Sequence, residues 1–175
     1  QICCTPVLLD EYKTFKNSES IKLQLLMEEL SNQLTKQKVL VFSQFKGMLH
    51  LIASGLKKEG IPHYHFDGDT KLALRQEMVD AFNTEEDPAR VFLISLKAGN
   101  TGLNLTAAEY VFLVDPWWNT AVEDQAIDRA HRIGQTKHVM AYKMICKDSI
   151  EERIINIQLR KGKTAQELIK TEESY

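Results

Sequence analysis

Apolar residues along this chain alternate between helical spacing and short continuous runs. Apolar positions that recur every three or four residues predict amphipathic helices, and short runs rich in β-branched and aromatic residues predict buried strands. The helices are expected at residues 23–34, 45–56, 74–82 and 120–131, and the strands at residues 39–42, 63–66, 91–94, 110–114 and 139–145. Strands separated by helices of this length are typical of right-handed βαβ units, so we expect an α/β domain whose parallel sheet is covered by helices on both faces.

One more helix is expected after the last strand. Ser149 followed by Glu152 is a capping-box pattern, isoleucines recur at helical spacing within residues 150–157, and Gly162 is a plausible C-terminal stop. The apolar face of this helix either covers the sheet of the same domain or docks on a neighbouring domain, and the pattern does not decide between the two.

Composition narrows the class of protein. The chain has 175 residues, of which 43% are hydrophobic, and 22 Lys and Arg face 24 Asp and Glu for a net charge of −2. This excludes a disordered, collagen-like or small disulfide-rich chain and fits one domain. No apolar run approaches the roughly 18 residues of a membrane span, so we expect an intracellular protein with three reduced cysteines and no membrane partner. Because the chain begins at Gln1 rather than Met, we expect a fragment of a longer protein.

A complete nucleotide site is not found in the sequence. Residues 162–164, Gly-Lys-Thr, resemble the end of a P-loop, but the required glycine five positions earlier is Ile157 inside a predicted helix. Asp115 follows a strand, as a magnesium-binding carboxylate would, yet Pro116 comes next and the P-loop is missing. We therefore interpret Asp115 as a residue that fixes the turn after its strand, and we expect no metal site in this chain.

The densest polar stretch on a predicted helix is QAIDRAHRIGQ, residues 125–135. Gln125, Arg129 and Arg132 are spaced i, i+4 and i+7, so all three would lie on one helical face. Two guanidinium groups on one face suit a polyphosphate, because each is a rigid, permanently charged set of donors. The alternative is an ordinary surface helix in which Asp128 pairs with Arg132.

Polar residues also follow three of the predicted strands. The loop of residues 95–105 combines small residues with Lys97, which would let backbone amides approach a phosphate, although a tight structural loop is the alternative. Ser43 and Gln44 could hold a backbone phosphate, or Ser43 could simply cap the next helix. The adjacent tryptophans 117–118 either plug the core or form a stacking surface, and we expect at least one of them to pack.

Five strings, in this order and at this spacing, resemble the C-terminal motor lobe of the Swi/Snf family of DNA-dependent ATPases, within helicase superfamily two. They are VLVFSQF, HFDGDTKLALRQEMVDAFN, SLKAGNTGLNLTAA, DPWWN and QAIDRAHRIGQTK. The resemblance implies a connector at residues 1–20, a RecA-like lobe at 21–147 and a C-terminal brace helix with its tail at 148–175. A first lobe outside this chain would hold the P-loop and the magnesium ligands.

The resemblance also implies roles for individual residues. Arg129 and Arg132 match arginine fingers that reach the γ-phosphate of ATP, and Gln125 and Gly102 match positions near the nucleotide. The positions that match DNA-contacting segments are Ser43, Gln44, Lys97, Thr101 and Trp118. The sequence departs from the family at Asn100, where glycine is usual, and at Thr120, where proline is usual and where Thr120 or Asn119 could cap the helix.

These matches imply half of an ATP-driven translocase on double-stranded DNA. ATP with magnesium would bind only in the full-length protein, the partners would be duplex DNA and the N-terminal ATPase lobe of the same polypeptide, and the fragment would be monomeric and inactive alone. The compact spacing resembles bacterial members, which implies the cytoplasm, or the nucleus if the source is eukaryotic. The alternatives are the corresponding lobe of an RNA helicase and a non-catalytic nucleic-acid-binding module.

Overall fold

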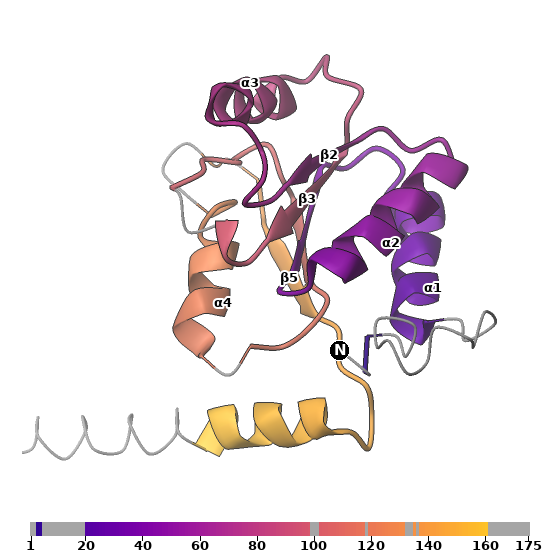
Figure 1. The fold of residues 1–175 in the computed structure, drawn as a ribbon, viewed down its shortest axis with the longest axis vertical. Helices are drawn as coiled ribbons and strands as arrows, with labels where there is room; N and C mark the ends of the chain where they lie inside the picture. The colour runs from indigo at the N-terminus through magenta and orange to yellow at the C-terminus, as the bar shows by residue number, and fades with distance from the viewer. Residues whose placement is uncertain are drawn as a thin grey trace, which may run out of the picture.

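The centre of the structure is a five-stranded parallel sheet (Figure 1). The computed structural model describes residues 3–4, 20–98, 102–117, 119–131, 135 and 137–160. The strands are β1 (Val39–Ser43), β2 (His63–Phe66), β3 (Val91–Ser95), β4 (Tyr110–Leu113) and β5 (Met140–Lys143). Their order across the sheet is β2-β3-β1-β4-β5. The expected parallel α/β fold is therefore confirmed, with β5 shorter than predicted.

Helices cover both faces of the sheet, as predicted (Figure 1). They are α1 (Ile21–Glu28), which continues into the π-helical turn η3 (Glu29–Gln33), α2 (Lys46–Lys58), α3 (Leu72–Asn83) and α4 (Thr120–Ile127). Residues 150–160 form a further helix, which lies outside the two layers. None of the helices in the described part of the chain is long and apolar enough to cross a membrane.

The central strand β1 explains how the two layers are joined. Its side chains alternate between the faces, and all five residues are buried. Val39 and Val41 pack with α1 and α2 in one core, and Leu40 and Phe42 pack with α3 and α4 in the other. A strand buried on both faces reads as a continuous apolar run, which is why the sequence signal was strong here.

The helix boundaries follow capping rules. The Ser20 side chain caps α1 by accepting a hydrogen bond from the Leu23 amide at 3.2 Å, and the Asn119 side chain caps α4 by accepting one from Ala121 at 3.1 Å. Gly60 adopts a φ of 68° just after α2, as expected of a C-terminal stop. Asn119, one of the two candidates in the sequence, is thus the residue that caps α4.

The predicted helix over residues 120–131 is too long. The helix α4 ends at Ile127. Residues 128–130 then form a turn, in which the Ala130 amide donates to the Ile127 carbonyl at 3.0 Å. The Arg129 carbonyl turns to accept a hydrogen bond from the Leu105 amide at 3.0 Å. This contact with a distant loop competes with continuation of the helix, so Arg129 lies beyond the helix rather than on its face.

The helix at residues 150–160 begins with a variant of the predicted capping box. The Ser149 hydroxyl accepts from the Glu151 amide at 3.1 Å, and the Glu152 carboxylate accepts from the Asp148 amide at 2.8 Å. Its inner face carries the buried residues Glu151 and Ile154. Of the predicted isoleucine stripe only Ile154 is buried, so the expected apolar face does not lie against the lobe as a whole.

Candidate nucleotide and nucleic-acid interface

The parallel sheet brings the predicted polar loops to one edge. Ser43 at the end of β1 is in register with Ser95 at the end of β3, and the Leu96 amide donates to the Ser43 carbonyl at 3.0 Å. On the other side of β1, the Val114 amide donates to the Phe42 carbonyl at 3.0 Å. The segments that follow β1, β3 and β4 therefore leave the sheet side by side, where ligands of open α/β sheets bind.

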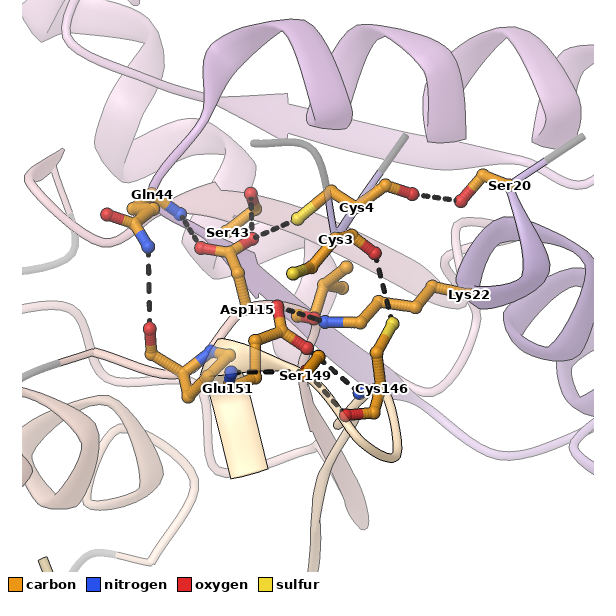
Figure 2. Close-up of polar contacts among 12 residues, drawn as sticks. Cys3, Cys4, Ser20, Lys22, Ser43, Gln44, Asp115, Cys146, Ser149 and Glu151 are labelled. Atoms are coloured by element: carbon orange, nitrogen blue, oxygen red, sulfur yellow. Dashed lines mark hydrogen bonds and ion pairs between the residues drawn. The ribbon is translucent and has the colours of Figure 1, made fainter. Parts of the chain in front are cut away.

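Asp115 is the buried centre of this edge (Figure 2). Its carboxylate accepts hydrogen bonds from the Ser43 hydroxyl at 2.5 Å and from the Gln44 amide at 2.8 Å. Burial raises the pKa of this carboxyl, while the bonds from Ser43 and Gln44 act in the opposite direction. Asp115 therefore ties the turn after β1 to the turn after β4, and its buried, occupied oxygens do not fit a magnesium ligand.

Ser43 and Gln44 are presented differently at this edge. Ser43 is fully buried and donates its hydroxyl proton to Asp115, so in this conformation the hydroxyl is not presented to a phosphate. Gln44 is half-buried, and its side-chain amide donates to the Pro116 carbonyl at 3.4 Å. Of the two residues, Gln44 is the one with surface left for a ligand.

The loop after β3 contributes a lysine and a conformationally special glycine. Lys97 is exposed, and the turn beneath it is fixed by the Ala98 amide, which donates to the Ser95 hydroxyl at 3.2 Å. Gly102 has a φ of 75°, and a Cβ built there would meet no atom within 4 Å. The backbone angle, rather than crowding, is thus what favours glycine at this position. Thr101 lies outside the described residues.

Arg129 joins the end of α4 to this loop. Its Nε donates to the Gln125 carbonyl at 3.1 Å, and its own carbonyl is bonded to the Leu105 amide. The residue is only 6% exposed, which differs from the expectation of a guanidinium standing free on a helical face. Gln125 is half-buried in α4, and Arg132 lies outside the described residues.

The tryptophan loop is held by two residues that the sequence did not single out. Trp117 packs partly buried against the α3 and α4 core, in agreement with the expectation that one tryptophan packs. Its amide donates to the buried Glu123 carboxylate at 2.8 Å, and its carbonyl accepts from Gln158 Nε2 at 2.5 Å. The second oxygen of Glu123 pairs with Lys143 at 2.6 Å. Trp118 lies outside the described residues.

The sequence also did not predict a buried ion pair between Lys22 and Glu151. Lys22 Nζ lies 2.7 Å from Glu151 Oε1 and donates to the Val114 carbonyl at 2.6 Å, which joins α1, the end of β4 and the C-terminal helix (Figure 2). Both side chains are nearly inaccessible to solvent. The partners are 129 residues apart in sequence, so no local spacing could have indicated the pair.

The cysteines lie beside this pair (Figure 2). All three are free thiols, as expected. Burial, with a further contribution from Asp115, raises the pKa of Cys4 to about 12. Among the described residues, no group of three or more His, Cys, Asp or Glu is arranged to hold a metal ion.

The parallel sheet, covered by helices and with its polar loops at the carboxyl edge, is a RecA-like α/β fold. The model of the Helicase conserved C-terminal domain matches residues 21–134, and the chain belongs to this family. Its relatives include Swi/Snf-family helicases, in agreement with the resemblance found in the sequence.

Similar proteins of known name or structure support this membership. The chain is 48% identical over 149 residues to the DNA repair protein RAD5 of Cryptococcus neoformans, covering 83% of this chain and 12% of that protein. It is 42% identical over 162 residues to a putative SWI/SNF-related regulator of chromatin of Arabidopsis thaliana, covering 92% of this chain and 18% of that protein. A crystal structure of the C-terminal part of the Fun30 ATPase domain superposes with a TM-score of 0.74 at 36% identity, covering 89% of this chain and 52% of that one. The chain thus spans less than a fifth of these two relatives.

Proposed function

We propose that this chain is the second motor lobe of an ATP-dependent translocase on double-stranded DNA. The observation that carries the proposal is the single edge at which the segments after β1, β3 and β4 meet, with the Arg129 turn bonded to the loop after β3. The hydrogen bond from the Leu105 amide to the Arg129 carbonyl supports the proposal, because it would couple a turn that responds to nucleotide with a loop that contacts nucleic acid. Closing and opening against a first lobe around ATP would move this edge along one DNA strand.

In the nucleotide site, Arg129 and Arg132 would stabilise the charge that develops on the γ-phosphate, and Gln125 and Gly102 would lie near it. Arg129 is only 6% exposed, so the substitution of Arg132 is the more direct test of this proposal. The magnesium ligands and the phosphate-binding loop would come from the first lobe of the same polypeptide.

Along the DNA track, Gln44, Lys97, Thr101 and Trp118 would contact the backbone or the minor groove. Ser43 would act through Asp115, holding the turn that presents Gln44, because its own hydroxyl is engaged there. A lobe with a net charge of −2 and one exposed lysine in this loop should bind DNA weakly and in a salt-sensitive way.

The test is ATP hydrolysis by the full-length protein carrying Arg132→Ala. We expect turnover at saturating DNA to fall by about 10³-fold, as for the loss of an arginine finger, while DNA affinity stays within twofold. The exposed Arg153 in the C-terminal helix offers a matched control, and Arg153→Ala should leave turnover unchanged. Equal losses of turnover and DNA affinity in Arg132→Ala would assign this residue to the DNA track or to the fold.

Two other functions make different predictions. A lobe of an RNA helicase would be stimulated by RNA rather than by duplex DNA, and a non-catalytic module would show no turnover in the full-length protein. The isolated 175-residue chain should hydrolyse ATP negligibly in our proposal, because it offers no phosphate-binding loop. A protein of the proposed kind acts inside the cell, in the nucleus or in a bacterial cytoplasm.

A further inference from the structure

The segment 114–117, which leads from β4 to Trp118, is held at both of its ends. The Val114 carbonyl accepts from Lys22 Nζ at 2.6 Å. At the other end, the Trp117 amide donates to Glu123 at 2.8 Å and the Trp117 carbonyl accepts from Gln158 at 2.5 Å. Between these ends lies Asp115, which fixes the turn of Gln44. The Gln44 side chain also donates to the Pro116 carbonyl at 3.4 Å, so the segment positions Gln44, one of the proposed DNA contacts.

The C-terminal helix contributes to the restraint at both ends, directly at Trp117 and through Lys22 at Val114. Gln158 binds the Trp117 carbonyl directly, and Glu151 holds Lys22 at 2.7 Å while its second oxygen accepts from the Cys146 amide at 2.9 Å. Residues 151 and 158 are seven apart, which places them on the same face about 10 Å apart along the helix. The contacts that Glu151 and Gln158 make with the lobe therefore come from one face of the helix.

We propose that Glu151 and Gln158 are positioning residues, through which the C-terminal helix clamps the segment 114–117 and sets how Gln44, which is bonded to Asp115 and Pro116 of that segment, meets DNA. The inference rests on the function proposed above. The two ends of the clamp differ in strength. Glu151 is buried in an ion pair and is a permanent anchor, whereas Gln158 is half-buried and makes one neutral hydrogen bond. The Gln158 end is consequently the one that opens at low cost.

The test uses the full-length protein with Gln158→Met, which keeps the length of the side chain and removes the donor. We expect the duplex DNA concentration for half-maximal ATPase stimulation to rise by about three- to tenfold, the range that corresponds to one neutral hydrogen bond. The maximal rate should stay within twofold, and the melting temperature should match that of the control. Asn156→Met is that control, because Asn156 is an exposed amide on the same helix. In Gln158→Glu, a carboxylate would face the Trp117 carbonyl, so the shift should be larger than in Gln158→Met.

The possible outcomes separate this inference from the function on which it rests. If the unmodified protein is not stimulated by duplex DNA, the proposed function fails. If it is stimulated but Gln158→Met and Asn156→Met have the same half-saturating DNA concentration, the clamp fails and the function stands. A parallel loss of maximal rate and melting temperature in Gln158→Met and Gln158→Glu, with no selective shift in half-saturation, would also overturn the clamp, because it would make Gln158 merely structural.

Discussion

The buried pair between Lys22 and Glu151 offers a sharp test of how this lobe is held together. The charged atoms are 2.7 Å apart, and the side chains are 4% and 7% exposed. Each charge has a second partner, because Lys22 also donates to the Val114 carbonyl and Glu151 also accepts from the Cys146 amide. The perturbation is the removal of each partner alone, by Lys22→Met and Glu151→Gln, and of both together.

The expected magnitude follows from the distance and the burial. At an effective dielectric constant of about 20, two charges at this separation attract by about 6 kcal/mol. Desolvation costs several kcal/mol for each ion, so the intact pair contributes little net stability. Removal of one partner leaves the other charge buried, which costs about 3–5 kcal/mol. The double substitution should therefore destabilise by at least about 2 kcal/mol less than the sum of the two single losses.

Urea unfolding followed by far-ultraviolet circular dichroism measures these losses. The slope of the unfolding free energy against urea should stay constant, so that shifts in the midpoint report stability. Lys57→Met, which removes an exposed lysine of α2, is the matched control and should change stability by less than about 0.5 kcal/mol. Additive losses, or single losses below about 1 kcal/mol, would refute the reasoning and mean that water reaches this pair.

Two further expectations concern titration. Burial, followed by the neighbouring His50, lowers the pKa of His65 below its usual 6.5, so the unfolded chain takes up a proton that the folded chain resists and stability should fall as the pH drops below about 6.5. His65→Gln should flatten this dependence in urea unfolding between about pH 7.5 and 5.5, and an unchanged slope would contradict it. A rise in the pKa of the Cys4 thiol from 9.0 to about 12 lowers its thiolate fraction about a thousandfold near pH 8. Mass spectrometry after iodoacetamide treatment should find Cys4 alkylated far more slowly in the folded chain than in urea, and rates within tenfold of each other would exclude a buried, protonated thiol.

The sheet and most helices could be predicted because their signals are local. The buried run of β1 follows from its β-branched and aromatic residues, β2 follows Pro62, and Gly60 marks the end of α2. The end of α4 could not be predicted, because a hydrogen bond from Leu105 to the Arg129 carbonyl depends on a loop far away in sequence.

The position of the candidate site at the edge of the sheet could be predicted from the sequence, but the side-chain contacts that hold its loops could not. The sequence placed polar residues after the strands β1, β3 and β4, and parallel strands bring their carboxyl ends to one edge of a sheet. The buried state of Ser43 and the contact of Gln158 with Trp117 depend on which side chains face each other across the fold. The C-terminal helix shows the difference most clearly, since its inner face carries Glu151 beside Ile154, whereas the sequence pattern predicted a stripe of isoleucines.

Buried polar groups in the described part of the chain are concentrated around the carboxyl edge of the sheet. They are Ser20, Lys22, Ser43, Asp67, Ser95, Asp115, Glu123, Arg129 and Glu151. A buried polar group costs stability unless it is hydrogen-bonded, and once bonded it fixes its partners in one arrangement. At this edge the partners include the backbone of the loops themselves, at positions 44, 114 and 117. The backbone of the loops proposed to contact DNA is thus held in place by hydrogen bonds to buried polar and charged side chains. The neutral contact of Gln158 with Trp117 lies at the rim of these buried groups, so it should break before the buried ion pair of Glu151 does.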